Sequence, residues 1–333
     1  MKIAFFEIED WEKDYLKKKL KKHKFIFIND KLNSENVKLV SDYDIISVFV
    51  YSKLDKNLLN KFTKLKAIVT RSTGFDHIDM DYCRKNKISV FNVPSYGENT
   101  VSEHTFALIL ALTRKIHKSY ERTIRGNFSL EGLRGFDLKG KTIGIVGVGK
   151  IGKNVARIAK GFQMNILAYD PIIDKRIEEE IGLKFVSLNY LLKNSDIVTF
   201  HCLYNKKTHH ILNKKNIGML KKNSIIINTA RGGIIDTEAI VKALTDRKIA
   251  GVGLDVLEEE SMIREERQLL STHFQKEYLK KLIENHILLT FDNVLITPHN
   301  AFNSIEALEK IMDVTVNNIN DIINKEKSLN IVK

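Results

Sequence analysis

The segment that most constrains the fold is a glycine-rich turn between an apolar run and a helical run, KTIGIVGVGKIGKNVARIAKGF, at residues 141–162. Gly147 permits a tight turn after the strand, and Gly149 lets the backbone approach a pyrophosphate. Gly152 lets the following helix pack closely on the strand, and the N-terminus of that helix would face the diphosphate. A strand, a glycine turn and a helix in this order predict one βαβ unit of a parallel sheet.

The next apolar run, NILAYD, ends on Asp170, 18 residues beyond Gly152. An acid in this place binds the ribose hydroxyls of a dinucleotide, and its carboxylate would repel a 2′-phosphate. We therefore expect dinucleotide binding, with NAD preferred over NADP. The alternative is a glycine-rich turn in another α/β protein, with Asp170 as a surface turn residue before Pro171.

Most of the chain alternates short β-branched or aromatic runs with charged helical stretches, the pattern of a parallel sheet covered by helices. With 333 residues, the chain also exceeds the size at which single hydrophobic cores stop growing. We therefore predict an α/β fold of two doubly wound parallel-sheet domains, Rossmann-like or flavodoxin-like, with an interdomain cleft. The runs are KIAFFEI, KFIFIN, DIISVFV, AIVTRS and ISVFNV, then KTIGIVG, NILAYD, DIVTFH, SIIINTA, GVGLDV and VLITPH.

The alternation is interrupted at PSYGENT, residues 94–100, where a proline and a glycine punctuate the chain. Asn99 or Thr100 is placed to cap a long helix that continues to about Arg125. The final stretch, NSIEALEKIMDVTVNNINDIINK, has apolar residues at helical spacing, and we expect it to pack back on the first domain. The predicted domains are residues 1–99 completed by 300–333, and residues 100–299.

Net charge, cysteine content and the length of the apolar runs argue against several classes of function. The net charge is +13, but the lysines are scattered, and the densest run, KDYLKKKLKKHK, is typical of the solvent face of an amphipathic helix. Cys83 and Cys202 lie far apart without a His or Cys cluster around them, which argues against disulfides and zinc. The N-terminus turns acidic within seven residues, and the longest apolar run, FALILALT, is too short to span a bilayer. We expect a cytoplasmic protein that binds no nucleic acid, membrane or metal.

Three apolar runs of the second domain are each followed by a polar group. SIIINTARGGIID leads to Arg231, AGVGLDVLEEE continues to Glu260, and VLITPHNAF reaches His299. Because strand carboxyl ends border the ligand crevice of an open α/β sheet, we expect these groups to converge. A guanidinium can grip a carboxylate and a carbonyl oxygen, histidine can exchange a proton near neutral pH, and glutamate can fix its tautomer. This set fits the oxidation of a 2-hydroxy acid.

Each of the three residues also has a purely structural interpretation. Arg231 could cap a turn beside two glycines, Glu260 could be a solvated acid in a run of three, and His299 could stand at a helix entry. Residue spacing alone leaves these alternatives open.

Four motifs in this order, GVGKIG, NTARGGIID, GLDVLEEE and TPHNAF, resemble the D-isomer-specific 2-hydroxyacid dehydrogenase family. The stretches TRSTGFDHIDMDYC and NVPSYGENTVSEHTFALILAL are most similar to its D-lactate dehydrogenase branch. The resemblance covers nearly the whole chain. It implies reversible hydride transfer between NAD and a small 2-hydroxy acid, with Arg231 binding the substrate, His299 as the acid/base and Glu260 as its partner. It also implies that the first domain and the C-terminal tail bind substrate, and that the glycine-rich domain binds NAD.

The resemblance implies further contacts and an assembly. Family members are typically homodimers joined through their cofactor domains, and the helix carrying SEHTFALILAL is similar to part of that interface. Leu203 stands where the family often has a proline, so we expect a looser loop there. Backbone N–H groups of Thr73 and Gly74 are implied to hold the substrate carboxylate, with Tyr51, Tyr96 and Phe302 around its C3 group. Besides the three glycines, the implied NAD contacts are Lys150, Ile151, Asp170, Cys202, Leu203, Thr208, Thr229, Ala230 and Asp255.

Two alternatives remain beside a D-lactate dehydrogenase. One is a related dehydrogenase for a larger or more polar acid, such as a branched-chain 2-keto acid, glyoxylate or hydroxypyruvate. The other is an NAD-sensing, corepressor-like binding protein, which can retain the same three residues. The sequence HNAF after the acid/base disfavours a phosphoglycerate dehydrogenase, and Glu260 disfavours a formate dehydrogenase, which has glutamine in that place. For Tyr51, ordinary core packing is an equal alternative.

Overall fold

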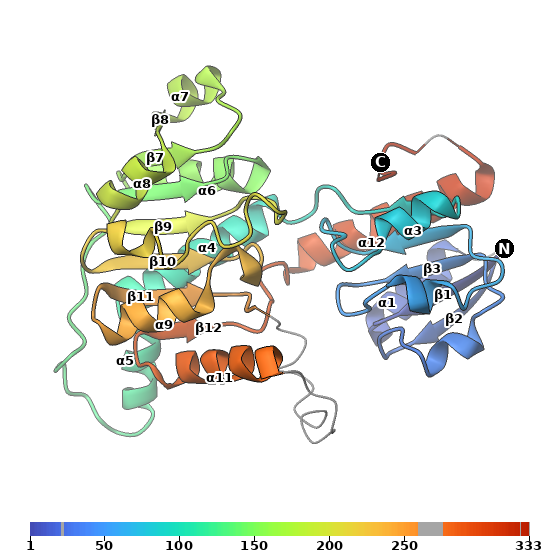
Figure 1. Ribbon diagram of the computed structural model, residues 1–333, viewed down its shortest axis with the longest axis horizontal. Helices are drawn as coiled ribbons and strands as arrows, with labels where there is room; N and C mark the ends of the chain where they lie inside the picture. The colour runs from blue at the N-terminus through green and yellow to red at the C-terminus, as the bar shows by residue number, and fades with distance from the viewer. Residues whose placement is uncertain (21–22, 259–275, 327, 333) are drawn as a thin grey trace. The chain divides into compact units, whose positions relative to one another are not determined.

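The computed structural model describes residues 1–20, 23–258, 276–326 and 328–332. The chain divides into two compact units, which are drawn in Figure 1. Unit 1 comprises Met1–Tyr96 and Asn303–Lys333, and unit 2 comprises Gly97–Phe302. Each unit is an α/β structure built around one parallel sheet, so the predicted fold class of two doubly wound domains is confirmed.

Unit 1 contains a five-stranded sheet in which every neighbouring pair is parallel. All residues of strands β3 and β4 are buried, because helices cover both faces. All five β-branched or aromatic runs predicted from the sequence form these strands. In spatial order they are β2 (Lys24–Ile28), β1 (Lys2–Phe6), β3 (Ile45–Val48), β4 (Ala67–Thr70) and β5 (Ser89–Phe91).

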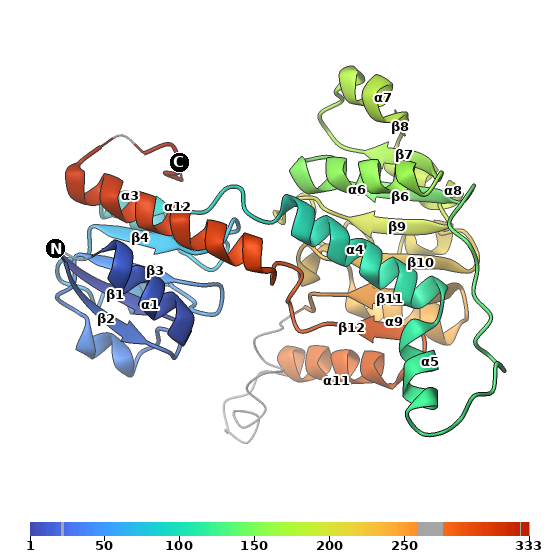
Figure 2. The ribbon, with the colours of Figure 1, turned by 180° about the vertical axis from the view of Figure 1, so that it is seen from behind.

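Helices α1 (Asp10–Lys19) and α12 (Ile305–Asn324) lie side by side on one face of this sheet (Figure 2). Leu16 of α1 and Met312 of α12 are both fully buried in the core of that face. The C-terminal stretch therefore packs on the first unit as predicted. The remaining helical segments are α2 (Lys56–Leu59), α3 (Met80–Lys85) and a 3-10 helix, Asn36–Leu39.

Unit 2 contains a seven-stranded parallel sheet. Six of its strands were predicted. The seventh, β8, was missed because it has only three residues with an exposed lysine at its centre, too short to show a period. The spatial order is β12 (Val294–Ile296), β11 (Ile249–Leu254), β10 (Ser224–Asn228), β9 (Ile197–Phe200), β6 (Thr142–Val146), β7 (Asn165–Tyr169) and β8 (Leu183–Phe185).

Helices cover both faces of this sheet (Figures 1 and 2). One face carries α4 and α6, and the other carries α8, α9 and α11. No helix of the described residues is long and apolar enough to cross a membrane. The helices are α4 (Glu98–Thr113), α5 (Ile116–Thr123), α6 (Lys150–Gly161), α7 (Lys175–Ile181), α8 (Leu188–Asn194), α9 (Thr237–Thr245) and α11 (Lys276–Thr290), with 3-10 helices Ile217–Met219 and Gly232–Ile234.

The helix after residue 97 differs from the prediction in two ways. Its N-cap is Gly97, whereas Asn99 and Thr100 already lie inside α4. The helix also does not run continuously to Arg125, because Lys115 adopts a left-handed conformation, with φ of 55°, and separates α4 from α5. A left-handed residue ends a helix, and nothing in the local sequence marks this break.

Candidate functional site

The glycine turn after β6 has the geometry that its spacing predicts. Gly147 has a φ of 96°, which side-chain-bearing residues rarely adopt, and a Cβ there would lie 2.5 Å from the backbone nitrogen of Cys202. A Cβ on Gly152 would lie 2.1 Å from the carbonyl oxygen of Gly147, so helix and strand touch through backbone. A Cβ on Gly149, the N-cap of α6, would meet nothing within 4 Å. The residues present thus fit a diphosphate at the N-terminus of α6.

Asp170 stands directly after β7 and reaches back to the glycine turn. Its Oδ2 atom accepts a hydrogen bond from the backbone nitrogen of Val148 at 2.7 Å, and its Oδ1 atom accepts one from Ile172. The carboxylate therefore lies beside the glycine turn, where a ribose would follow a bound diphosphate.

Two residues after β9 line the other side of this turn. Burial raises the pKa of the Cys202 thiol to about 11, so the thiol stays protonated at neutral pH and is not a nucleophile. Burial lowers the pKa of His201 to about 3, so the imidazole is neutral. Its Nε2 atom lies 2.9 Å from the hydroxyl of Thr199. The backbone of both residues therefore packs against Gly147, and both side chains are uncharged at neutral pH.

The loop after β9 is closed by a side-chain hydrogen bond despite the missing proline. The Thr208 hydroxyl donates to the carbonyl of Leu203 at 2.5 Å, while the Leu203 side chain is 79% exposed. Thr229 is buried and its hydroxyl contacts that of Thr105 in α4. Lys150 is exposed and approaches Glu98, and Ile151 packs against the core beneath α6.

Arg231 follows β10 by three residues and is the N-cap of the 3-10 helix Gly232–Ile234. The backbone around it is held by Asn228, whose side-chain amide donates to the Arg231 carbonyl and whose Oδ1 atom accepts from Ala230. The Nη1 atom of Arg231 donates to the Ala230 carbonyl at 2.8 Å.

His299 follows β12 by three residues, in a turn that is hydrogen-bonded to the end of the neighbouring strand β11. It has a φ of 54°, in the left-handed region. The Asp255 carboxylate, directly after β11, accepts hydrogen bonds from the Thr297 hydroxyl at 2.5 Å and from the backbone nitrogens of Asn300 and Ala301, each at 2.9 Å. Asp255 thereby fixes the backbone on both sides of His299.

The position of Asp255 adds a role that the sequence did not reveal. Its carboxylate is 1% exposed, and both of its oxygens accept hydrogen bonds from the turn that contains His299. Burial alone would raise the pKa of Asp255, but hydrogen bonds from His104, Thr297, Ala301 and Asn300 outweigh burial and hold that pKa below its usual range. His104 belongs to α4, and its Nε2 atom lies 3.1 Å from the Thr297 hydroxyl. The predicted contact between Asp255 and NAD stays a prediction.

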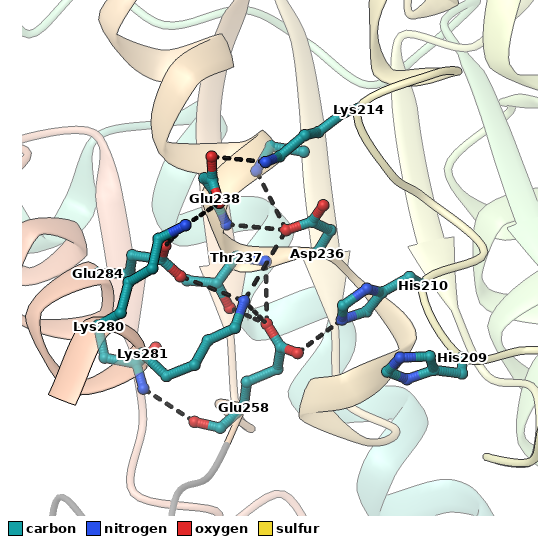
Figure 3. A network of polar contacts seen from close by, with 12 residues as sticks. His209, His210, Lys214, Asp236, Thr237, Glu238, Glu258, Lys280, Lys281 and Glu284 are labelled. Carbon is teal, nitrogen blue, oxygen red and sulfur yellow. Dashed lines mark hydrogen bonds and ion pairs between the residues drawn. The ribbon is translucent and has the colours of Figure 1, made fainter. Parts of the chain in front are cut away.

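Strands β10, β11 and β12 are neighbours in the sheet, so Arg231, Asp255 and His299 all follow strand ends at one edge. Glu260, predicted as the partner of His299, lies outside the described residues. In the acidic run that contains Glu260, Glu258 is only 9% exposed and joins a polar network, drawn in Figure 3. Glu258 is therefore a buried acid, while the alternative of a solvated acid at Glu260 stays untested.

In unit 1, the predicted substrate residues follow the carboxyl ends of strands β3, β4 and β5. The loop with Tyr51 is anchored by Glu7, whose carboxylate accepts hydrogen bonds from the Phe49 and Tyr51 nitrogens at 2.8 and 2.7 Å. The carbonyl groups of Thr73 and Gly74 accept from Asn92 and Ser72. Tyr96 ends this unit, and Phe302 ends unit 2.

No group of three His, Cys, Asp or Glu residues that could hold a metal ion occurs within the described part of the chain.

Residues 106–301 match the family model described as D-isomer specific 2-hydroxyacid dehydrogenase, NAD binding domain.

Curated relatives and solved structures extend the similarity to both units. A 2-hydroxyacid dehydrogenase homolog of Haemophilus influenzae is 38% identical over 324 residues, 96% of this chain and 95% of that protein. The D-lactate dehydrogenase of Escherichia coli is 34% identical over 327 residues, 97% of each chain. The crystal structure of D-lactate dehydrogenase from Aquifex aeolicus, complexed with NAD and lactic acid, has a TM-score of 0.88 and 34% identity, covering 97% of this chain and 96% of that one. This protein therefore belongs to the D-isomer-specific 2-hydroxyacid dehydrogenase family of NAD-dependent oxidoreductases.

Proposed function

We propose that this protein is a D-lactate dehydrogenase that reversibly reduces pyruvate to D-lactate with NADH. The observation that carries the proposal is the likeness, over nearly the full length, to the Aquifex aeolicus enzyme complexed with NAD and lactic acid. The identity to the Escherichia coli D-lactate dehydrogenase supports the same substrate. The D configuration rests on these relatives, because residue types do not tell which face of the ketone receives hydride.

Each proposed catalytic residue has one chemical task. Arg231 grips the carboxylate and the C2 carbonyl oxygen of the keto acid, and its positive charge polarises that carbonyl. NADH, when bound, supplies the hydride that C2 receives. His299 donates its proton to the carbonyl oxygen during reduction and takes it back during oxidation. Glu260, outside the described residues, keeps the imidazole in the required tautomer and favours its protonated form.

The proposed NAD site is built around the glycine turn. The open space at Gly149 and the N-terminus of α6 accommodate the diphosphate, while Asp170 receives the adenosine ribose. A carboxylate beside the ribose disfavours NADP through repulsion of its 2′-phosphate. The other proposed contacts are Lys150, Ile151, Cys202, Leu203, Thr208, Thr229, Ala230 and Asp255.

Substrate selection is proposed to involve residues at the strand ends of unit 1 together with Phe302. Thr73 and Gly74 supply backbone N–H groups for the substrate carboxylate. Tyr51, Tyr96 and Phe302 limit the size of the group at C3. Because the Glu7 carboxylate anchors the loop that contains Tyr51, this position has a fixed backbone on which selection can depend.

The test is a panel of 2-keto acids with NADH, followed by chiral analysis of the product. The expected result is the highest kcat/KM with pyruvate and formation of D-lactate. Faster turnover of a branched-chain keto acid, glyoxylate or hydroxypyruvate would replace the lactate assignment and retain the reaction class. NADH binding with no turnover of any 2-keto acid would favour the corepressor-like alternative.

We further propose a homodimer that joins the NAD-binding units. A groove of about 500 Å³ between α4 and α6 has Phe106, Ala107 and Leu110 in its lining. Phe128 and Leu130, which follow α5, are 78% and 82% exposed, and a subunit contact that covered them would remove apolar surface from water. Light scattering after size exclusion should give twice the chain mass, and Phe128→Asp with Leu130→Asp should lower it toward one chain. A monomer in the unmodified protein would contradict the proposal.

A cytoplasmic location is also proposed. Both cysteines are free thiols, Cys83 is buried, and a reducing compartment preserves this state. Fractionation of cells that express the tagged chain should place the protein with cytosolic markers.

A further inference from the structure

The carboxylate of Glu258 connects three segments that are far apart in the sequence (Figure 3). Its Oε1 atom lies 2.6 Å from Nε2 of His210, in the loop after β9. Its Oε2 atom accepts hydrogen bonds from the hydroxyl and backbone nitrogen of Thr237, at the start of α9, at 2.6 and 3.1 Å. The same oxygen accepts from Lys281 of α11 at 2.9 Å. One buried side chain thus holds a loop and two helices.

The Glu258 carboxylate is ionised. Burial alone would raise its pKa, but the hydrogen bonds from Thr237, His210 and Lys281 outweigh burial and hold the pKa below its usual range. An ionised carboxylate only accepts hydrogen bonds, so the Nε2 atom of His210 carries the proton and donates it to the contact.

The backbone at Glu258 also touches the residue that follows Arg231. A Cβ on Gly232 would lie 2.1 Å from the carbonyl carbon of Leu257 and 2.4 Å from the backbone nitrogen of Glu258. These distances are too short for any side chain. The turn after Arg231 and the chain leading into Glu258 therefore pack backbone against backbone.

A closed ring of contacts follows from these two observations. The backbone nitrogen of His210 donates to the carbonyl of Gly233 at 2.9 Å, and the His210 side chain binds Glu258. The segment from Arg231 to Thr237 is therefore held at Gly232 by packing, at Gly233 through His210, and at Thr237 by two hydrogen bonds. The Glu258 carboxylate makes the two hydrogen bonds to Thr237 and holds the side chain of His210, whereas the packing at Gly232 is backbone against backbone.

We propose that Glu258 is a positioning residue that fixes the Arg231 turn for binding of the substrate carboxylate. Its carboxylate acts through Thr237 and, by way of His210, through Gly233, and it does not touch the substrate. This inference rests on the proposed function, because it takes Arg231 as the group that grips the keto acid. A purely structural role for Glu258 would alter stability and leave substrate binding by the folded enzyme unchanged.

The main test is Glu258→Gln in the full-length enzyme. Glutamine keeps the shape but cannot neutralise Lys281, and its NH₂ group cannot accept a hydrogen bond. The expected result is a rise of about tenfold in KM for the keto acid, with the dissociation constant of NADH, read from its fluorescence, changed less than about twofold. Thr237→Val removes one hydroxyl donor with little change in shape, and should raise KM by a smaller factor. This variant provides the test if Glu258→Gln fails to fold.

The matched control is Glu238→Gln. Glu238 lies in the same cluster, but its side chain is 39% exposed and pairs with Lys214 and Lys280 at the surface. Its replacement removes ion pairs of the same kind at the surface, so KM should stay at the unmodified value. A rise in KM equal to that of Glu258→Gln would attribute the effect to general loss of charge and overturn the proposal.

A double-mutant cycle separates positioning from independent effects. If Glu258 acts through Arg231, Glu258→Gln should lower kcat/KM much less in an Arg231→Lys background than in the unmodified enzyme. Hydrogen exchange of the peptide covering residues 229–237 should also be faster in Glu258→Gln than in Glu238→Gln. A folded Glu258→Gln with unchanged KM, additive effects or unchanged exchange would overturn the proposal. Absence of turnover in the unmodified protein would instead refute the proposed function.

Discussion

Asp255 and Ala301 are separated by 46 positions, yet the Oδ2 atom of Asp255 accepts a hydrogen bond from the Ala301 backbone nitrogen at 2.9 Å. Together with its bonds to Thr297 and Asn300, this contact fixes the turn that holds His299 in a left-handed conformation. Because folding has already fixed the backbone of this turn, the reaction does not have to pay the entropy of orienting the side chain that it carries.

Asp255→Asn should lower both stability and turnover. The amide keeps one acceptor and loses the other, so at least one buried donor of the His299 turn is left unpaired, at a cost of about 1–3 kcal/mol in the free energy of unfolding. Urea unfolding and kcat for pyruvate measure the two effects. Asp246→Asn is the control, since Asp246 is an exposed residue paired with Lys242, and it should change neither quantity. Unchanged kcat in Asp255→Asn would contradict the positioning of His299 by Asp255.

The same carboxylate predicts a pH dependence of stability. Because its native pKa lies below the ordinary value of 3.8, Asp255 contributes stability that is fully present above that value. The contribution is lost as the pH falls through the native pKa. The unmodified protein should therefore lose free energy of unfolding more steeply on acidification below about pH 4 than Asp255→Asn does. Parallel pH curves for the two proteins would contradict this expectation.

His299→Gln should abolish most turnover while leaving NADH binding intact. Glutamine retains a hydrogen-bonding side chain but cannot exchange a proton near neutral pH, and loss of a general acid typically costs about 10²–10⁴-fold in rate. Steady-state kcat and a fluorescence titration with NADH separate the two effects. Unchanged turnover would refute the acid/base role.

Arg231→Lys should mainly weaken binding of the keto acid. An ammonium group is a point charge and cannot reproduce the fork that holds a carboxylate and a carbonyl oxygen together. The expected result is a KM for pyruvate raised about tenfold or more, with NADH affinity unchanged. A lower kcat with normal KM would place Arg231 elsewhere in the reaction.

Asp170→Ala should relax the preference for NAD over NADP. The substitution removes the charge that would repel a 2′-phosphate, and it also removes the acceptor for the Val148 nitrogen in the glycine turn. The ratio of kcat/KM with NADPH to that with NADH should rise, while NADH binding weakens. An unchanged ratio would show that another residue selects the cofactor.

Arg71→Met should destabilise unit 1. Arg71 is 1% exposed, donates to the carbonyls of Phe6 and Glu7, and pairs with Glu12. Its removal leaves the buried Glu12 without its cation, which typically costs about 3–5 kcal/mol. Denaturant unfolding measures the loss, and Arg84→Met is the control, because Arg84 pairs with Asp81 at the surface. Equal stability of the two variants would contradict a structural role for the buried pair.

Strand positions could be predicted largely from the sequence, because fully buried parallel strands are continuous apolar runs. All eleven predicted runs became strands, and the missed β8 has only three residues with a lysine at its centre. The glycine turn was equally readable, since Gly147, Gly149 and Gly152 follow each other within six positions, and Gly147 and Gly152 each answer a local steric demand. These features could be predicted because they depend on local apolar runs and local steric contacts.

The break at Lys115 and the contacts around the proposed catalytic residues were decided by tertiary structure. Asp255 reaches a turn more than 40 residues away, and Glu258 binds His210 and Lys281 from two other segments. Hydrogen bonds between distant segments leave no periodic pattern in the sequence. An acidic residue after a strand does not show by itself which distant segment it will contact. The sequence by itself determined the strands, the glycine turn and the types of the reacting groups. Only the folded sheet, which brings the ends of β10, β11 and β12 to one edge, decided which acids hold Arg231 and His299 in place.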